Sequence, residues 1–205
     1  MESRRWARDS IGAAVAVDLD LSQLHRLSAH EYHRILEAGG FDEGARVELL
    51  GGLLVAMSPK TRAHENAVAW LARWLMQAVE FDLFEVRVAS PLTLEDSEPE
   101  PDLAVIALNA PRPYHPATAT LIIEIAVSSL RRDLGTKTDL YARAGVPEYW
   151  VLALDQRRLI VRRDVRPDVG EYAQSIEFDE STRVSCAAVA LPELAITDVL
   201  AAANT

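Results

Sequence analysis

The sequence predicts an α/β (α+β) fold in which a mixed β-sheet is flanked by helices and preceded by an N-terminal helix and a β-hairpin. Residues 121–154 read as strand, helix and strand, a pattern typical of a crossover between parallel strands. Turn pairs elsewhere predict antiparallel hairpins, so the sheet is expected to be mixed. Of the 205 residues, 49% are apolar and 25% are charged, an ordinary globular composition that excludes disordered and low-complexity classes.

The first two elements are marked by local signals. Ser28 and Glu31 have the spacing of a capping box, which predicts a helix that ends at a following glycine pair. A second glycine pair, at 51–52, predicts a two-residue turn between strands over 47–50 and 53–57. We therefore expect a short helix and a hairpin ahead of the sheet.

The sheet and its covering helices follow from the spacing of apolar residues. These recur at helical spacing from Val68 to Val79, which predicts a long helix before most of the strands. A second helix over 133–144 ends where Gly145 and Pro147 provide a stop signal. Strands are expected over 83–88, 102–106, 121–127, 148–154, 158–163 and 171–178, with a short terminal helix over 196–202.

The chain shows no internal repeat or long linker, so residues 1–24 are expected to form an arm and residues 25–205 a single domain. The arginines near the N-terminus resemble an export signal only in part, because the apolar stretch after them is short and lacks a convincing cleavage site. No run approaches the ~20 apolar residues of a membrane span. A single cysteine, Cys186, excludes a disulfide framework and a cysteine-built zinc site. We expect a cytoplasmic protein without a membrane partner.

The net charge restricts the kind of nucleic-acid partner. The chain carries 21 Lys and Arg against 31 Asp and Glu, and a formal net charge of −10 argues against tight, sequence-independent coating of DNA. A local phosphate site is still open, because residues 126–166 hold nine basic and five acidic residues. We expect such a site around Arg131, Arg132 and Lys137.

Two carboxylates stand out against their surroundings. Glu124 interrupts an apolar strand of the kind that is covered on both faces, where an ionised carboxylate is costly unless a metal, a cation or hydrogen bonds compensate. Asp102 is expected to begin another strand, directly after Pro101. It is a candidate metal ligand only if the fold places it close to Glu124. Carboxylates brought together in this way suit Mg²⁺ or Mn²⁺. The alternative for Glu124 is a buried salt bridge or a strand end that reaches solvent.

Three further residues each have a structural and a chemical interpretation. Lys137 shares the apolar face of its helix, so either its stem packs while the ammonium reaches water, or the ammonium approaches Glu124 or a bound phosphate. Glu48 is a lone strand glutamate, and such residues are usually solvated. His64 lies on the inner side of a helix's first turn, where packing is a more common role than ligation or base catalysis.

The pattern of segments resembles a known family. No GxSxG, P-loop or HExxH pattern occurs, which excludes the common hydrolase and nucleotidase classes. The chain instead resembles the bacterial Uma-two family, described as putative restriction endonucleases and placed in the PD-(D/E)XK nuclease superfamily. The resemblance covers about residues 28–165. It rests on residues 46–57 (RVELLGGLLVAM), on His64, on Pro101-Asp102-Leu103 and on residues 123–152, where GVPEYW is the most specific part.

The resemblance implies a restriction-endonuclease-like fold with a metal site. Asp102 and Glu124 match the two metal-binding carboxylates of the family. Glu48 matches an additional upstream acid with a catalytic and metal-binding role, and His64 matches the histidine that opens the following helix. The implied cofactor is Mg²⁺ or Mn²⁺.

The resemblance departs from the superfamily pattern at its lysine. That lysine normally lies two residues after the second carboxylate, where this chain has Ala126, so Lys137 from the next helix is the implied catalytic cation. The implied chemistry is metal-assisted hydrolysis of phosphodiester bonds in nucleic acid, expected to be DNA. Two alternatives stay open: a catalytically silent nuclease-like binding module, and a metal-dependent hydrolase of RNA or nucleotides. A homodimer is also open, because nucleases that cut both strands are commonly dimers.

Overall fold

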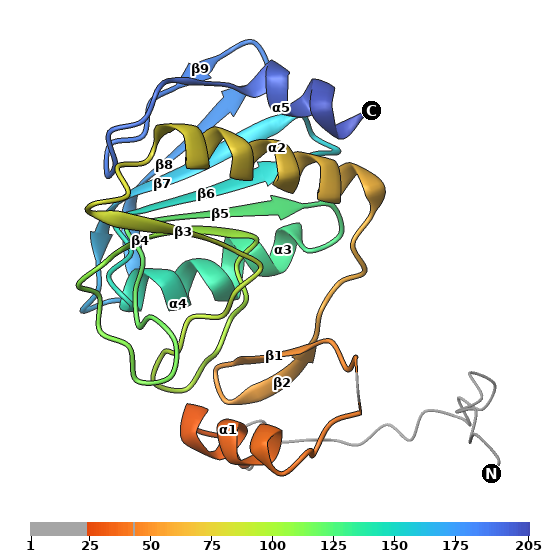
Figure 1. The fold of residues 1–205 in the computed structure, drawn as a ribbon, viewed down its shortest axis with the longest axis vertical. Coiled ribbons are helices and arrows are strands. Elements are labelled where there is room, and N and C mark those ends of the chain that lie inside the picture. The colour runs from red at the N-terminus through yellow and green to blue at the C-terminus, as the bar shows by residue number, and fades with distance from the viewer. Residues whose placement is uncertain (1–23, 43) are drawn as a thin grey trace, which may run out of the picture.

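A six-stranded mixed sheet organises the protein, as the computed structural model in Figure 1 shows. The structure describes residues 24–42 and 44–205, so the predicted arm over 1–24 lies outside the described residues except for its last position. The strand order is β3-β4-β5-β6-β7-β8, and only the pair β5–β6 is parallel. The prediction of a mixed sheet with one crossover is therefore confirmed. The strands are β3 (Phe84–Val88), β4 (Leu103–Ala107), β5 (Leu121–Ala126), β6 (Glu148–Ala153), β7 (Arg158–Arg166) and β8 (Glu171–Asp179).

Helices cover both faces of this sheet. One face carries α2 (Arg62–Ala78) and α5 (Ile196–Ala203), and the other carries α3 (Leu130–Arg132) and α4 (Thr138–Arg143) (Figure 1). None of the helices in the described part of the chain combines the length and apolar character needed to cross a membrane. Two further short strands, β9 (Arg183–Val184) and β10 (Leu194–Ala195), pair antiparallel with each other, and β10 directly precedes α5.

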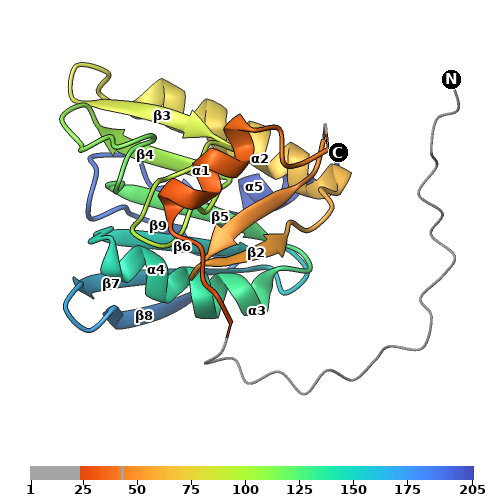
Figure 2. The ribbon, with the colours of Figure 1, turned by 90° about the horizontal axis from the view of Figure 1, so that it is seen from below.

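The N-terminal helix and hairpin lie on the α4 side of the sheet (Figures 1 and 2). Helix α1 (Ala29–Glu37) begins with the predicted capping box, in which Ser28 and Glu31 exchange hydrogen bonds. Strands β1 (Val47–Leu50) and β2 (Leu53–Ala56) pair in the register expected from their glycine turn. This hairpin stands over the sheet, where it can enclose a site together with the helices of that face.

The two faces of β5 belong to different cores. Ile123 and Ile125 pack on the α2 side, whereas Ile122 and Ala126 pack on the α4 side. Because side chains alternate along a strand, Glu124 shares the α4 side with the second pair. The sheet therefore delivers this carboxylate beneath the helix that follows β5.

That helix differs from the prediction of one regular element over 133–144. It begins at Leu130, and a π-helical turn over Asp133–Lys137 separates α3 from α4. A π-helical turn holds one residue more than an α-helical turn, and the spacing of apolar residues does not predict it here. Turns of this kind are frequent at functional sites.

Glu148, at the start of β6, fixes the C-terminal segment to the sheet. Its buried carboxylate accepts hydrogen bonds from the Trp150 indole (2.8 Å), from Arg163 (2.8 and 2.9 Å) and from the backbone amides of Ala187 (2.6 Å) and Ala188 (2.9 Å). Burial alone would raise the pKa of Glu148, but these hydrogen bonds outweigh it and hold the pKa below its ordinary value. The charged form therefore stabilises the fold.

Glu148→Gln is expected to lower the free energy of unfolding by about 2 kcal/mol at pH 7, because the substitution removes hydrogen bonds to a charged group. Since the pKa is depressed in the folded protein, the contribution is present above the unfolded pKa of about 4.3 and disappears as the pH falls through the folded value. Urea unfolding at pH 7 and at lower pH measures both effects. Glu177→Gln, in an exposed pair with Arg158, is the matched control and should change stability little. Equal effects of the two substitutions would contradict the anchoring role.

Candidate active site

Asp102 and Glu124 meet where β4 and β5 lie side by side. The antiparallel register pairs Leu103 with Ile123, which brings the preceding Asp102 opposite Glu124. The Asp102 amide lies 3.4 Å from Glu124 Oε2, and the Ile125 amide donates to Asp102 Oδ2 at 2.9 Å. Both carboxylates are buried, so their charges must be compensated within the protein.

Lys137 supplies much of that compensation. Its Nζ lies 2.8 Å from Glu124 Oε1 and 3.3 Å from Glu48 Oε2. Only 4% of Lys137 is exposed, so the interpretation in which its ammonium reaches water is wrong. Glu48 is also buried, at 2% exposure, which overturns the expectation that a lone strand glutamate is solvated. The hairpin, the sheet and the π-helical turn thus contribute to one ionic cluster.

Tyr141 completes the environment of Glu124 and is not predicted from the sequence as a site residue. Its hydroxyl donates to Glu124 Oε1 at 2.9 Å, beside the Lys137 ammonium. Tyr141 lies four residues after Lys137 on the same helical face, and that spacing is the signal that could have identified it. Together the two donors hold one oxygen of Glu124 and leave its other oxygen directed toward Asp102.

His64 supports Asp102 from α2. Its Nε2 lies 3.0 Å from Asp102 Oδ2, while its buried Nδ1 has no hydrogen-bond partner among the described residues. His64 reaches the edge of the cluster because Thr61 caps the first turn of α2 through the His64 amide. His64 is therefore buried, as the packing interpretation predicts, and it also contacts Asp102, whereas ligation or base catalysis by His64 itself stays a prediction.

The electrostatics of the cluster favour a bound cation. Burial raises the pKa of Glu124 to about 8, with the Lys137 ammonium opposing this rise and the Asp102 carboxylate adding to it. Burial would lower the pKa of Lys137, but Glu124 and Glu48 outweigh it and keep the pKa above its ordinary value. Lys137 therefore stays charged, and its ammonium contacts Glu48 and Glu124, while the Asp102 carboxylate adjoins Glu124. This donor set fits Mg²⁺ or Mn²⁺, which prefer carboxylate oxygens.

The cluster opens to the surface beside the hairpin. A small pocket of about 50 Å³ is lined by Glu48, His64, Asp102, Glu124 and Lys137, among others. A groove of about 560 Å³ lies next to it, between the hairpin and α3, and Arg131 and Arg132 line that groove.

The two arginines of α3 have different surroundings. Arg132 donates to the Ala56 carbonyl (3.1 Å) and to Ser58 Oγ (3.3 Å), and its guanidinium lies 3.6 Å from Glu48. It therefore ties α3 to the hairpin. Arg131 is exposed, and its positively charged side chain lines the groove.

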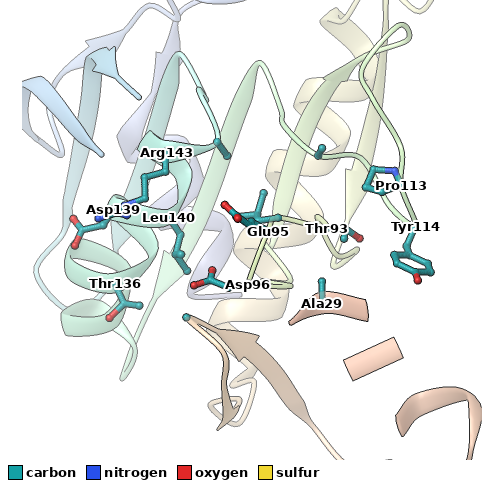
Figure 3. A pocket seen from close by; sticks show the side chains of 14 residues that line it. Ala29, Thr93, Glu95, Asp96, Pro113, Tyr114, Thr136, Asp139, Leu140 and Arg143 are labelled. Atoms are coloured by element: carbon teal, nitrogen blue, oxygen red, sulfur yellow. The ribbon is translucent and has the colours of Figure 1, made fainter. Parts of the chain in front are cut away.

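A larger cavity of about 770 Å³ lies between the α4 segment and the loops on either side of β4 (Figure 3). Thr136, Asp139 and Arg143 line it from one side, and Glu95 and Asp96 line it from the loop before β4. None of the candidate catalytic residues contributes to its wall. The largest of these cavities is therefore separate from the candidate active site.

Comparison with known proteins supports the nuclease-like fold. Residues 29–198 match the family model Uma2, described as "Putative restriction endonuclease". A crystal structure described as "a putative nuclease belonging to DUF820", from Anabaena variabilis, is similar with a TM-score of 0.69 and 13% sequence identity, over 86% of this chain and 99% of that one. At this identity the structural likeness shows the fold alone. Among curated proteins, none matches the chain.

Lys137→Met is expected to destabilise the metal-free protein by about 3 kcal/mol, because Glu48 and Glu124 would stay buried without their ammonium partner. Urea unfolding at pH 7 in the presence of a chelator measures the change. Arg131→Met, an exposed neighbour on the same helical segment, is the matched control and should stay within about 0.5 kcal/mol of the original chain. Unchanged stability in Lys137→Met would show that the buried ion pairs do not hold the hairpin and helix together.

Proposed function

The chain belongs to the Uma2 family of restriction-endonuclease-like proteins, and from this we propose that it is a metal-dependent endonuclease that hydrolyses phosphodiester bonds of DNA. The observation that carries the proposal is the convergence of Glu48, Asp102, Glu124 and Lys137 in one buried cluster that opens to the surface. Lys137 contacts Glu48 and Glu124, and Asp102 adjoins Glu124, so the cluster holds more buried carboxylate than a purely structural ion pair needs.

In this proposal Asp102 and Glu124 hold the divalent cation, and Glu48 binds it directly or through water. Each of the three can present a carboxylate oxygen toward the small pocket that they line. When bound, Mg²⁺ or Mn²⁺ activates water and neutralises charge on the scissile phosphate. His64 keeps the Asp102 carboxylate in place through its 3.0 Å contact, and so acts as a positioning residue.

Lys137 is proposed to supply the catalytic cation that a lysine on the strand supplies elsewhere in the superfamily. The usual position is Ala126, which packs in the apolar core on the α4 side. Lys137 approaches the same carboxylate from the π-helical turn, at 2.8 Å from Glu124. A fixed cation in a water-poor site stabilises the charge that develops on phosphate in the transition state. The departure from the strand pattern is therefore compatible with catalysis.

The nucleic-acid backbone is proposed to follow the groove between the hairpin and α3. Arg131 is exposed there and belongs to the basic stretch over 126–166, whereas the chain as a whole carries −10. A local basic groove beside the metal ligands can bind phosphate even though the overall field repels it. Duplex DNA is the proposed substrate, and RNA and nucleotides are the alternatives that a substrate panel separates.

Asp102→Asn and Glu124→Gln are each expected to abolish Mn²⁺- or Mg²⁺-dependent cleavage of supercoiled plasmid, because each removes a charged metal ligand without changing side-chain volume. Agarose gels of plasmid nicking and linearisation measure the effect, and circular dichroism confirms that each variant folds. Glu65→Gln, an exposed acid next to His64, is the matched control and should cut like the original chain. Cleavage by both site variants at the original rate would assign the activity to a contaminant. Metal binding to the original chain without cleavage of any substrate would favour the silent binding module.

Arg131→Met is expected to weaken binding of duplex DNA and to lower the slope of log affinity against log salt by about 0.9 for each phosphate that the variant no longer neutralises. Fluorescence anisotropy in an Asp102→Asn background measures binding without cleavage. Arg183→Met, an exposed arginine on β9 near α5, is the matched control. An equal decrease in affinity in both variants would indicate a general charge effect, and unchanged affinity in Arg131→Met would remove the groove from the path of the DNA.

A further inference from the structure

A second cluster of ligating side chains lies apart from the ionic cluster described above. His33 comes from α1, Glu98 from the loop before β4, and His115 from the loop between β4 and β5. Their ligand atoms all lie within 4.8 Å of one another. His33 Nε2 lies 2.5 Å from Glu98 Oε2, and His115 Nε2 lies 3.8 Å from Glu98 Oε1. The two imidazoles therefore lie next to different oxygens of the Glu98 carboxylate.

Among the described residues, the Glu98 carboxylate has no lysine or arginine partner. Its side chain is 4% exposed, and no Lys or Arg of the described residues forms an ion pair with it. The two imidazoles are its only ion-pair partners in that part of the chain, and the 3.8 Å separation from His115 is too long for a hydrogen bond. A buried carboxylate in this position needs either a protonated imidazole or a metal ion.

The surrounding residues hold the three side chains in place. The Thr93 hydroxyl donates to Glu98 Oε2 at 3.0 Å and accepts from the His115 amide at 3.0 Å. The Tyr114 ring stacks on the His33 imidazole at a centroid distance of 3.9 Å. Positioning of this kind is what a metal site needs, because the orientations of a ligating histidine and carboxylate are usually fixed by their neighbours.

We propose that His33, Glu98 and His115 bind a divalent transition-metal ion, with Zn²⁺ the best chemical match. Two neutral imidazoles and one carboxylate are a common zinc ligand set and leave a fourth position for water. Mg²⁺ is a poor match, since it prefers oxygen ligands and retains its own water. The site is chemically distinct from the all-carboxylate cluster proposed to hold Mg²⁺ or Mn²⁺.

The position of this site indicates what a bound ion would do. It would join α1 to the two loops that flank β4. The Glu98 amide donates to the Leu49 carbonyl at 2.7 Å, next to Glu48, and Asp102 follows in the same loop. The ion would therefore brace the segments that carry two of the candidate active-site acids. Thr93 and Tyr114 also line the 770 Å³ cavity, so the site lies at the edge of that cavity (Figure 3).

Zinc titration of the full chain tests the proposal without using nuclease activity. The Asp102→Asn/Glu124→Gln double variant serves as the background, so that the carboxylate cluster does not contribute a strong second site. Isothermal titration calorimetry is expected to find about one Zn²⁺ per chain, with Mg²⁺ in excess failing to compete. His33→Gln and His115→Gln in this background should weaken Zn²⁺ binding more than about tenfold. His25→Gln, an exposed histidine elsewhere in the N-terminal segment, is the matched control and should leave it unchanged.

A thermal shift gives a second readout. Zn²⁺ is expected to raise the melting temperature of the double variant and of His25→Gln, but not that of His115→Gln. His115 is 34% exposed in its side chain, so its substitution tests ligation without removing a core residue. Absence of Zn²⁺ binding in the double variant, or binding that survives both histidine substitutions, would overturn the proposal and leave a hydrogen-bonded His33–Glu98 pair. Neither result bears on the proposed nuclease function, which is judged by plasmid cleavage.

Discussion

The buried ammonium of Lys137 is the contact on which the arrangement of the site depends. It lies within 3.3 Å of both Glu48 and Glu124, and so links the hairpin, the central strand and the helical segment that follows that strand. Carboxylates placed this deep repel one another strongly because little water screens them. The ammonium between them, together with the Arg132–Glu48 pair, favours closure of the hairpin over this face of the sheet. The same contact stabilises the buried carboxylates of the cluster.

The topology of the sheet explains how distant residues reach this point. The parallel pair β5–β6 requires a crossover, and the crossover helix must return over one face of the sheet. That face is the one on which Glu124 lies, so any lysine on the inner side of the crossover is brought near it. The π-helical turn over Asp133–Lys137 then sets where along the helix the ammonium comes to lie. The crossover therefore accounts for the meeting of Glu124 with Lys137, whereas Glu48, Asp102 and His64 reach the site from other elements.

Much of this could be predicted from the sequence, because the signals are local or periodic. The capping box, the glycine turn of the hairpin and the strand–helix–strand pattern are each confirmed, and Glu124 stands out because it interrupts an apolar strand. The burial of Glu48 could not be predicted from its strand, since it depends on Lys137 far along the chain. The same holds for two other contacts, because each joins residues far apart in the sequence. These are the hydrogen bonds of Glu148 with the 187–188 backbone and the contact between His33 and Glu98. Periodicity reports the neighbours along an element and not the contacts between loops.

The buried acidic residues of this protein lie in three kinds of surroundings, and each kind favours a different partner. Glu148 is saturated by hydrogen-bond donors, so its charge is fully satisfied and serves stability. Asp102 and Glu124 are only partly satisfied, and the remaining charge suits a hard cation in an oxygen-rich pocket. Glu98 faces imidazoles in place of ammonium or guanidinium groups, which suits a softer ion. The net charge of −10 is thus a poor guide to function, because part of it is buried in clusters whose partners determine their chemistry.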